Sequence, residues 1–110
     1  MVSQDDETQT VRTTSLLGNF PNPFNPSTTI LFSLSSGEGR GEGIAIVNIV
    51  IYNIRRQRVR TLANQVVEPG LHSVEWDGRN DKDEKLGSGI YLYRLEAGDF
   101  REIRRMILLK

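Results

Sequence analysis

The sequence predicts an all-β fold, an antiparallel sandwich of about six or seven short strands. From Ser27 onward the apolar residues recur with a period of two, which is typical of strands with one face in a core. No window carries a sustained helical stripe, and the Gly and Pro residues fall between the apolar runs. The connections are too short for parallel crossovers, which need roughly a dozen residues or more. A chain of 110 residues has the length of one domain.

The first two predicted strands differ in how many of their faces are apolar. Ile30, Phe32 and Leu34 alternate with Leu31 and Ser33, which suits a strand with one face in the core. The segment Ile44–Tyr52 is apolar on both faces and largely β-branched, which predicts a central strand. The glycine-rich residues 37–43 between the two strands are expected to form a flexible hairpin loop.

The remaining strands are bounded by turn residues. The expected segments are a short strand at Val59 and Leu62, a strand over Leu71–Trp76, and two strands over Ile90–Leu95 and Phe100–Leu109. Pro69-Gly70 breaks the chain before the second of these, and Ala97-Gly98-Asp99 joins the last two as a hairpin turn. Residues 1–14 are polar and are expected to form a flexible linker before a folded domain over 15–110.

Composition excludes several classes of function. Fourteen Lys and Arg balance fourteen Asp and Glu, so the chain lacks the basic footprint of a general nucleic-acid binder. No Cys is present, which excludes disulfides, thiolate metal sites and a cysteine nucleophile. No apolar run approaches the ~20 residues of a membrane-spanning helix. The acidic first residues do not resemble a signal peptide, so the protein is either cytoplasmic or one end of a longer exported protein whose signal lies elsewhere; the motifs described below favour the second.

No catalytic or cofactor signature is found, and the sequence predicts a protein that is not an enzyme. The glycines at 37–43 lack the spacing of a dinucleotide loop and the Lys-Ser/Thr of a phosphate loop. His72 shares a strand face with Val74 and Trp76, so we expect a structural histidine. Asp77, Asp81, Asp83 and Glu84 fail the EF-hand register, because Arg79 and Lys82 stand at key positions; a solvated turn is favoured over a weak calcium site.

Two basic clusters and four aromatic residues have both structural and functional interpretations. The clusters are Arg55, Arg56, Arg58 and Arg60, and then Arg101, Arg104, Arg105 and Lys110. We favour solvated sheet edges that discourage aggregation over contact with an anionic surface such as lipopolysaccharide. Tyr52, Trp76, Tyr91 and Tyr93 lie at strand positions, where core packing is favoured over stacking on sugars.

Several motifs follow one another in a distinctive order. They are Asn22-Pro23-Phe24-Asn25-Pro26, Trp76-Asp77-Gly78, Gly89 with Tyr91, and the terminal run Arg104 to Lys110. In this order, over about 90 residues, the chain resembles the carboxy-terminal sorting domain of the type IX secretion system, or Por secretion tail, of Bacteroidetes-type bacteria. That domain is similar to the Ig-like domain of the flagellar hook-capping protein. Arg56 departs from the resemblance, because the family has Gly there and a bulky residue at positive φ is strained; a different turn type is expected.

The resemblance implies an Ig-like β-sandwich that acts as a non-catalytic sorting and attachment domain. It implies a larger N-terminal passenger protein that crosses the periplasm and is delivered to the cell surface or secreted. The implied partners are the outer-membrane translocon and a sortase-like transpeptidase, which would cut in the linker between Val2 and Ser15. No cofactor is implied.

We expect the translocon to recognise the end of the chain. The hypothesis is strand addition along the edge formed by residues 100–110, because an edge strand that carries large apolar residues is sticky. The candidate recognition residues are Arg104, Arg105, Met106, Ile107, Leu108, Leu109 and Lys110. The three prolines upstream favour an extended segment, which Phe20 and Phe24 are expected to anchor on the sandwich.

Three other functions remain open at this point. The first is a flagellar hook-cap-like module with the same fold. The second is an adhesion or carbohydrate-binding module that uses Trp76 or Tyr91. The third is a self-assembling surface subunit, such as a filament subunit, that pairs the C-terminal edge strand with other copies of the chain.

Overall fold

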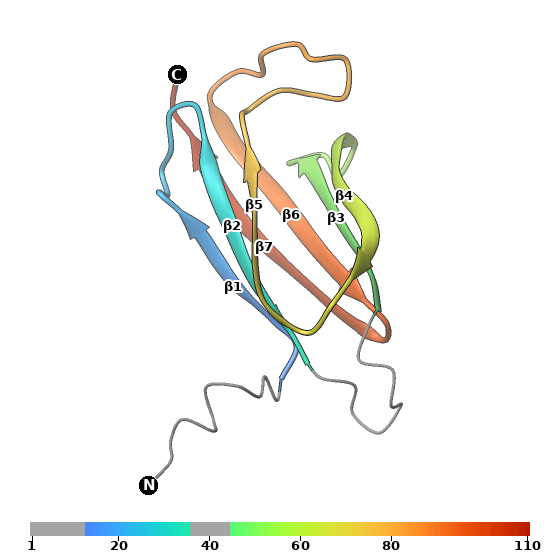
Figure 1. The fold of residues 1–110 in the computed structure, drawn as a ribbon. Coiled ribbons are helices and arrows are strands. Elements are labelled where there is room, and N and C mark those ends of the chain that lie inside the picture. Colours follow the sequence, from blue (N-terminus) through green and yellow to red (C-terminus); the bar gives the residue numbers. More distant parts are fainter. Residues whose placement is uncertain (1–12, 36–44) are drawn as a thin grey trace, which may run out of the picture.

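The computed structural model describes residues 13–35 and 45–110, and within them the chain forms two antiparallel sheets and no helix (Figure 1). One sheet has the strand order β1-β2-β5 and the other has the order β4-β3-β6-β7. The strands are β1 (Ser15–Phe20), β2 (Thr28–Leu34), β3 (Ala45–Asn53), β4 (Arg58–Val67), β5 (Gly70–Trp76), β6 (Gly89–Ala97) and β7 (Phe100–Leu108). The predicted antiparallel sandwich is confirmed.

The alternation that predicted strands also orders the core. In β2, every second residue from Thr28 to Leu34 is buried. In β3, Val47, Ile49 and Ile51 are fully buried between the sheets. β3 pairs with β4 on one side and β6 on the other, so its prediction as a central strand is confirmed. Its outer face is covered unevenly, because Val50 is buried there while Ile46 is exposed.

Two elements differ from the predictions. β1 was missed, because a register shift between Leu16 and Gly18 interrupts its alternation. β4 is longer than the expected short strand and extends to Val67, since it pairs with the whole of β3. The predicted flexible loop at 37–43 lies outside the described residues. So does the predicted linker, apart from Thr13 and Thr14, which hydrogen-bond to Ser33 and Ser35.

The centre of the core is aromatic. Phe24, Trp76 and Tyr91 are buried, with ring centroids 5.7 Å apart for the first pair and 5.5 Å for the second. Tyr93 is also buried, so the prediction that these aromatic residues belong to the core is confirmed for Trp76, Tyr91 and Tyr93. The expectation for Phe20 is wrong, because its side chain is 56% exposed and only Phe24 anchors the proline-rich segment.

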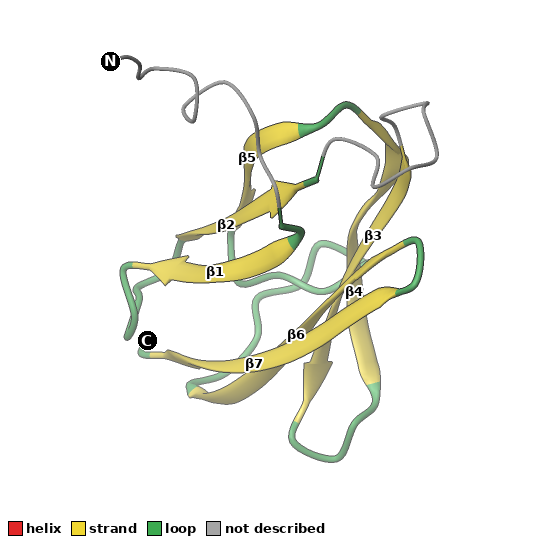
Figure 2. Cartoon of the chain, turned by 90° about the horizontal axis from the view of Figure 1, so that it is seen from below, coloured by secondary structure: helices red, strands yellow, loops and turns green. Residues whose placement is uncertain are grey.

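Both sheets end in strands with an unpaired edge. β1 lies against β7 on one side of the sandwich, and β4 approaches β5 on the other (Figure 2). A two-residue loop joins β6 to β7, and Gly98 in it adopts a φ of 61°, as tight hairpins require. Residues 13–35 and 45–110 contain no helix that is long and apolar enough to cross a membrane.

Candidate functional site

The C-terminal strand β7 is the edge of the four-stranded sheet; among the described strands it pairs with β6 alone, and an isolated parallel bridge joins its Leu108 to Phe24. Its seven predicted recognition residues do not share one environment. Met106 and Leu108 are 0% and 2% exposed and belong to the core. Arg104, Arg105, Ile107, Leu109 and Lys110 are exposed. Five of the seven predicted recognition residues are thus accessible on the surface, and the other two, Met106 and Leu108, are part of the core.

The end of β7 is held by the connection between β1 and β2. Phe24 N–H donates to the Ile107 carbonyl, and Leu109 N–H donates to the Phe24 carbonyl, each at 2.9 Å. Ile107 N–H donates to Asn22 Oδ1 at 3.0 Å. We call residues Asn22, Pro23 and Phe24 the clasp. Both ribbon views place the C-terminus beside this connection (Figures 1 and 2).

The clasp limits the predicted strand addition. On the open side, the N–H and C=O of Ile107 and the N–H of Leu109 are already bonded to the clasp, while Lys110 N–H donates to the Ser88 hydroxyl at 2.7 Å on the side of β6. Of the proposed edge over residues 100–110, a new strand can pair only with the part before Ile107.

The motif residues converge on this same region from three separate segments. Trp76 packs on Phe24, and its indole N–H donates to the Arg79 carbonyl at 2.9 Å. Gly78 has a φ of 78°, and a Cβ there would lie 3.0 Å from the Pro26 carbonyl oxygen and 3.6 Å from Leu108. Two further hydrogen bonds lie in this region. The Asp77 carboxylate accepts from Arg79 N–H at 3.1 Å, and the Tyr91 hydroxyl donates to the Gly87 carbonyl at 2.8 Å. Gly89 begins β6, and Asn25 is exposed beside the clasp.

A chain of hydrogen-bonded polar side chains in the interior ends at Pro21, next to the clasp. The Tyr93 hydroxyl donates to Asn19 Oδ1 at 3.0 Å, and Asn19 Nδ2 donates to Thr28 Oγ1 at 3.1 Å. The Thr28 hydroxyl in turn donates to the Pro21 carbonyl at 2.8 Å. Burial raises the pKa of Tyr93 to about 12; the positive charge of Arg104 acts to lower this pKa and the negative charge of Glu102 to raise it. Sequence reasoning missed this chain of hydrogen bonds, because two of its bonded members, Asn19 and Tyr93, are 74 residues apart in the sequence.

Charges along β7 are partly paired. Arg101 lies 2.9 Å from Glu96, and Arg104 lies 2.9 Å from Glu102, measured between guanidinium and carboxylate atoms. Glu102 also accepts from Leu16 N–H at 3.4 Å, which links β7 to β1. In the described part of the chain, Arg105 makes no ion pair.

The acidic loop after β5 does not gather its carboxylates into a metal site. Asp81 accepts from Thr61 N–H at 3.1 Å, and Asp83 lies 3.8 Å from Arg79. Glu84 accepts from Asn80 Nδ2 at 2.8 Å. Asp77 and Asp83 thus share Arg79 as a partner, and Asp81 and Glu84 face other groups. Within residues 13–35 and 45–110, no group of three or more acidic, His or Cys residues could hold a metal ion.

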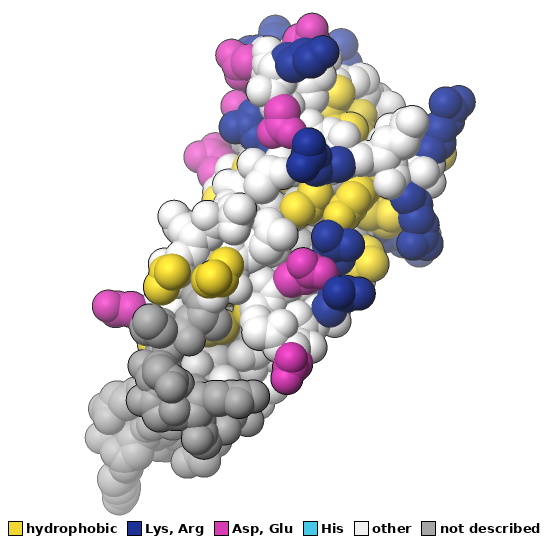
Figure 3. Space-filling view, turned by 90° about the vertical axis from the view of Figure 1, so that its right-hand side faces the viewer, with side chains coloured by type: hydrophobic (Ala, Val, Ile, Leu, Met, Phe, Trp, Pro, Cys, Tyr) yellow, Lys and Arg dark blue, Asp and Glu magenta, His cyan; other side chains and the backbone are white. Residues whose placement is uncertain are grey.

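The first basic cluster surrounds the turn between β3 and β4. Arg60 donates to the Asn80 carbonyl at 3.1 Å, and Arg58 lies 4.0 Å from Asp81, so these two hold the acidic loop. Arg55 and Arg56 are exposed at the tip. Figure 3, a view from the side of β3 and β4, shows basic side chains gathered around exposed hydrophobic ones in the upper half of the molecule.

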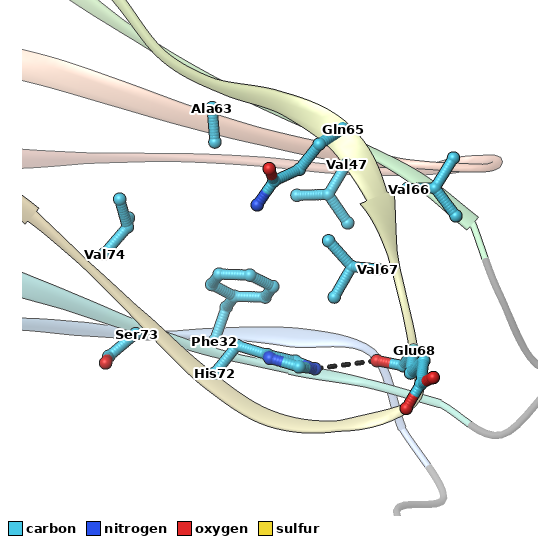
Figure 4. Close-up of a pocket in the computed structure, with 10 residues that line it drawn as sticks. All are labelled: Phe32, Val47, Ala63, Gln65, Val66, Val67, Glu68, His72, Ser73 and Val74. Atoms are coloured by element: carbon cyan, nitrogen blue, oxygen red, sulfur yellow. Dashed lines mark hydrogen bonds between the residues drawn. The ribbon is translucent and has the colours of Figure 1, made fainter.

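A cavity of about 320 Å³ opens where β4 and β5 diverge (Figure 4). Its lining is mainly apolar, from Phe32, Val67 and Val74 among others, and it includes His72. The imidazole lies 2.7 Å from the Glu68 carbonyl and stacks on Phe32 with centroids 5.5 Å apart. Ser73 is exposed and directs its hydroxyl away from the ring, since neighbouring strand residues face opposite sides. His72 thus has the contacts of a structural histidine.

Comparisons with known proteins give a family and a fold. The family described as FlgD Ig-like domain matches residues 32–99. Among solved structures, dimeric latent PorU from Porphyromonas gingivalis is 21% identical with a TM-score of 0.66, over 88% of this chain and 9% of that chain. PorZ, an essential bacterial surface component of the type IX secretion system of the same organism, is 16% identical with a TM-score of 0.55, over 87% of this chain and 12% of that chain.

The family match covers part of the sandwich, and the matches to solved structures extend over most of the chain. No curated protein matches the chain. At these identities the two solved structures show the fold alone, and the chain spans only 9% and 12% of their lengths. The family match begins at Phe32 and ends at Asp99, so the clasp and β7 lie outside it.

Proposed function

This chain belongs to the family of FlgD Ig-like domains, and we propose that it is a non-catalytic sorting and attachment domain of the type IX secretion system. In this proposal it directs a larger N-terminal passenger protein through the periplasm to the cell surface or the medium. The proposed partners are the outer-membrane translocon and a sortase-like transpeptidase. PorZ, a similar fold, is a surface component of that system, which supports the proposal.

The convergence of the motif residues on the end of β7 carries the proposal. Asn22 and Phe24 bond the backbone of Ile107 and Leu109, while Gly78 makes room for the turn beside Leu108. The stability of the sandwich alone does not explain why three separate segments hold the last residues of the chain in place. A chain whose last residues are read by a partner gains a pre-organised surface, because the ordering entropy is lost before binding.

Export of a fusion protein tests the proposal. A reporter joined to the N-terminus of the full chain is produced in a bacterium with an active type IX system. The variant Ile107→Ser/Leu109→Ser alters two exposed positions, 40% and 49% exposed, and leaves Met106 and Leu108 in the core. We expect the reporter to remain in the periplasm.

The matched control is Ile46→Ser/Val66→Ser, which removes two exposed apolar residues at the far end of the same sheet. We expect this control to reach the surface like the parent chain. Thermal unfolding of both variants shows whether the sandwich is retained. Normal delivery of the Ile107→Ser/Leu109→Ser fusion would overturn the proposed role.

The family match favours one second candidate, a module of a flagellar hook-cap-like protein. Retention of purified hook protein by the immobilised chain, unaffected by Ile107→Ser/Leu109→Ser, would favour it over sorting. Carbohydrate binding through Trp76 and Tyr91 has less support, because these side chains are 0% and 8% exposed and offer no platform for a sugar.

A further inference from the structure

β7 keeps an open stretch between the hairpin and the clasp. The N–H and C=O of Ile107 both face the clasp. In antiparallel pairing, alternate residues direct both groups to the same side. The register of β6 with β7 shows no shift between Ile107 and Arg101. The N–H and C=O groups of Arg101, Ile103 and Arg105 therefore face away from β6, and in the described chain no strand lies beyond them. We call residues 101–105 the open edge.

The side chains of the open edge form a defined pattern. Arg101, Ile103 and Arg105 point to the outer face of the sheet, and Ile103 is 46% exposed. Arg105 stands opposite Leu92, so its charge has no acidic neighbour across the strand. On the inner side, Glu102 and Arg104 pair with each other at 2.9 Å. The outer row thus reads basic, apolar, basic, with the Arg101 guanidinium already 2.9 Å from Glu96 on β6 and the Arg105 guanidinium without an ion pair in the described chain.

We propose that the open edge binds an extended segment of another protein by strand addition, and that this segment has the pattern acidic–x–apolar–x–acidic. The acidic residues stand opposite Arg101 and Arg105, and the apolar residue stands opposite Ile103. Opposite charges and apolar pairs at directly facing positions stabilise neighbouring strands. The pattern reads the same in both directions, so it suits either strand orientation. This inference rests on the proposed function in one respect: the bound segment is taken to belong to a protein of the export machinery.

A second copy of the chain does not fit the same edge. Two-fold antiparallel pairing within residues 101–105 allows five registers in which the outward-facing backbone groups meet. Four of them set Arg101, Glu102, Arg104 or Arg105 opposite its own copy. The fifth centres on Ile103 and sets Arg101 opposite Arg105 on the outer face and Glu102 opposite Arg104 on the inner face. Like charges directly opposite are destabilising, so four registers are disfavoured and the fifth places repulsion on the outer row, where an acidic partner would place attraction.

Peptide binding tests the inference without any export step. A labelled nine-residue peptide with the core Glu-Thr-Val-Thr-Glu is titrated against the full chain by fluorescence anisotropy, and a second peptide carries Lys in place of both Glu. We expect the Glu peptide to bind and the Lys peptide to bind at least tenfold more weakly. Hydrogen exchange is expected to slow at the amides of Arg101, Ile103 and Arg105, with no change at Ile107.

Three variants sharpen the test. Arg105→Glu is expected to weaken the Glu peptide about tenfold and to strengthen the Lys peptide. Ile103→Pro removes an N–H that has no partner in the fold, and the variant should remain folded because Pro is tolerated on edge strands. Without this N–H the edge loses a hydrogen bond to the added strand, so we expect the variant not to bind the peptide. Arg55→Glu, at the tip of the β3–β4 turn, is the matched control and is expected to bind like the parent chain.

Three results would overturn the inference. They are equal binding of the Glu and Lys peptides, no binding of either, and a concentration-dependent dimer in sedimentation that protects the same amides. An export defect of Ile107→Ser/Leu109→Ser together with failed peptide binding would retain the proposed function and reject this partner.

Discussion

Tyr93 connects three parts of the molecule through one hydroxyl group. The group lies in the sandwich interior on β6 and donates to Asn19 of β1, which in turn bonds Thr28 at the start of β2. A buried acceptor that loses its donor costs about 1–3 kcal/mol. The neutral hydroxyl is the form that this chain requires, because an ionised tyrosine cannot donate.

The stability of the fold should therefore decline in alkaline solution. The pKa of Tyr93 is raised to about 12 in the folded state, against about 10 in the unfolded chain. The unfolded state thus releases this proton first as the pH rises. The contribution of Tyr93 is fully present below pH ~10 and is lost as the pH rises toward ~12. Urea unfolding between pH 8 and pH 12 measures the decline.

Tyr93→Phe separates this contribution from other alkaline effects. We expect the variant to lose about 1–3 kcal/mol at neutral pH and to show a shallower alkaline decline. Part of the decline should remain, because burial also raises the pKa of Tyr91. Tyr52→Phe, on the outer face of β3, is the control and should follow the parent chain. An unchanged alkaline slope in Tyr93→Phe would contradict the assignment.

At the scale of elements, two turns of the chain have the same arrangement of side-chain hydrogen bonds. In Asn53–Gln57, the Asn side chain accepts from the N–H groups two and four residues later, at 2.9 and 3.0 Å, and its amide donates to the Gln side chain. Asn80–Glu84 repeats the same bonds with Glu in place of Gln. In both turns the fourth residue has a positive φ without being glycine, 67° for Arg56 and 64° for Asp83. The Asn side chain holds the left-handed residue in place.

Arg56 thus adopts the positive φ that the sequence argument expected a bulky residue to avoid, and the strain can be measured. Arg56→Gly should raise the free energy of unfolding by about 1 kcal/mol, since a left-handed residue with a Cβ costs roughly 1–2 kcal/mol and Gly does not pay it. Arg55→Gly, one position earlier and not at positive φ, should instead lower it by about 0.4–1 kcal/mol. Chemical unfolding of both variants gives the comparison. Equal effects would show that the turn is not strained at Arg56.

At the scale of the whole molecule, the sandwich and six of its seven described strands could be predicted from sequence, but β1, the order of the strands in each sheet and the clasp could not. The period of two at Ile30, Phe32 and Leu34 is local, and burial on one face follows from it directly. The contact of Phe24 with Ile107 and Leu109 is made by backbone groups more than 80 residues apart, which leave no periodic trace in either segment. The repeated Asn-x-x-x-Gln/Glu spacing was visible in the sequence and was not used.

Phe24 is the side chain through which the clasp joins both sheets. It packs on Trp76 of the three-stranded sheet, and its backbone pairs with the end of β7 in the four-stranded sheet. Phe24→Ala should lower the free energy of unfolding by about 3–5 kcal/mol, the usual range for a buried phenylalanine. Phe20→Ala, at an exposed position four residues earlier, should stay within about 0.5 kcal/mol of the parent chain.

The same pair of variants tests whether the clasp couples the sheets. Trp76 is the only tryptophan, so its fluorescence reports on the core beside Phe24, and far-UV circular dichroism reports on both sheets. For the parent chain and Phe20→Ala the two signals should change together, as in a single cooperative transition. Phe24→Leu keeps most of the buried volume and should remain folded, with the amides of Ile107 and Leu109 exchanging faster than in the parent chain. If Phe24→Ala proves no less stable than Phe20→Ala, the last residues of the chain are held by β6 alone.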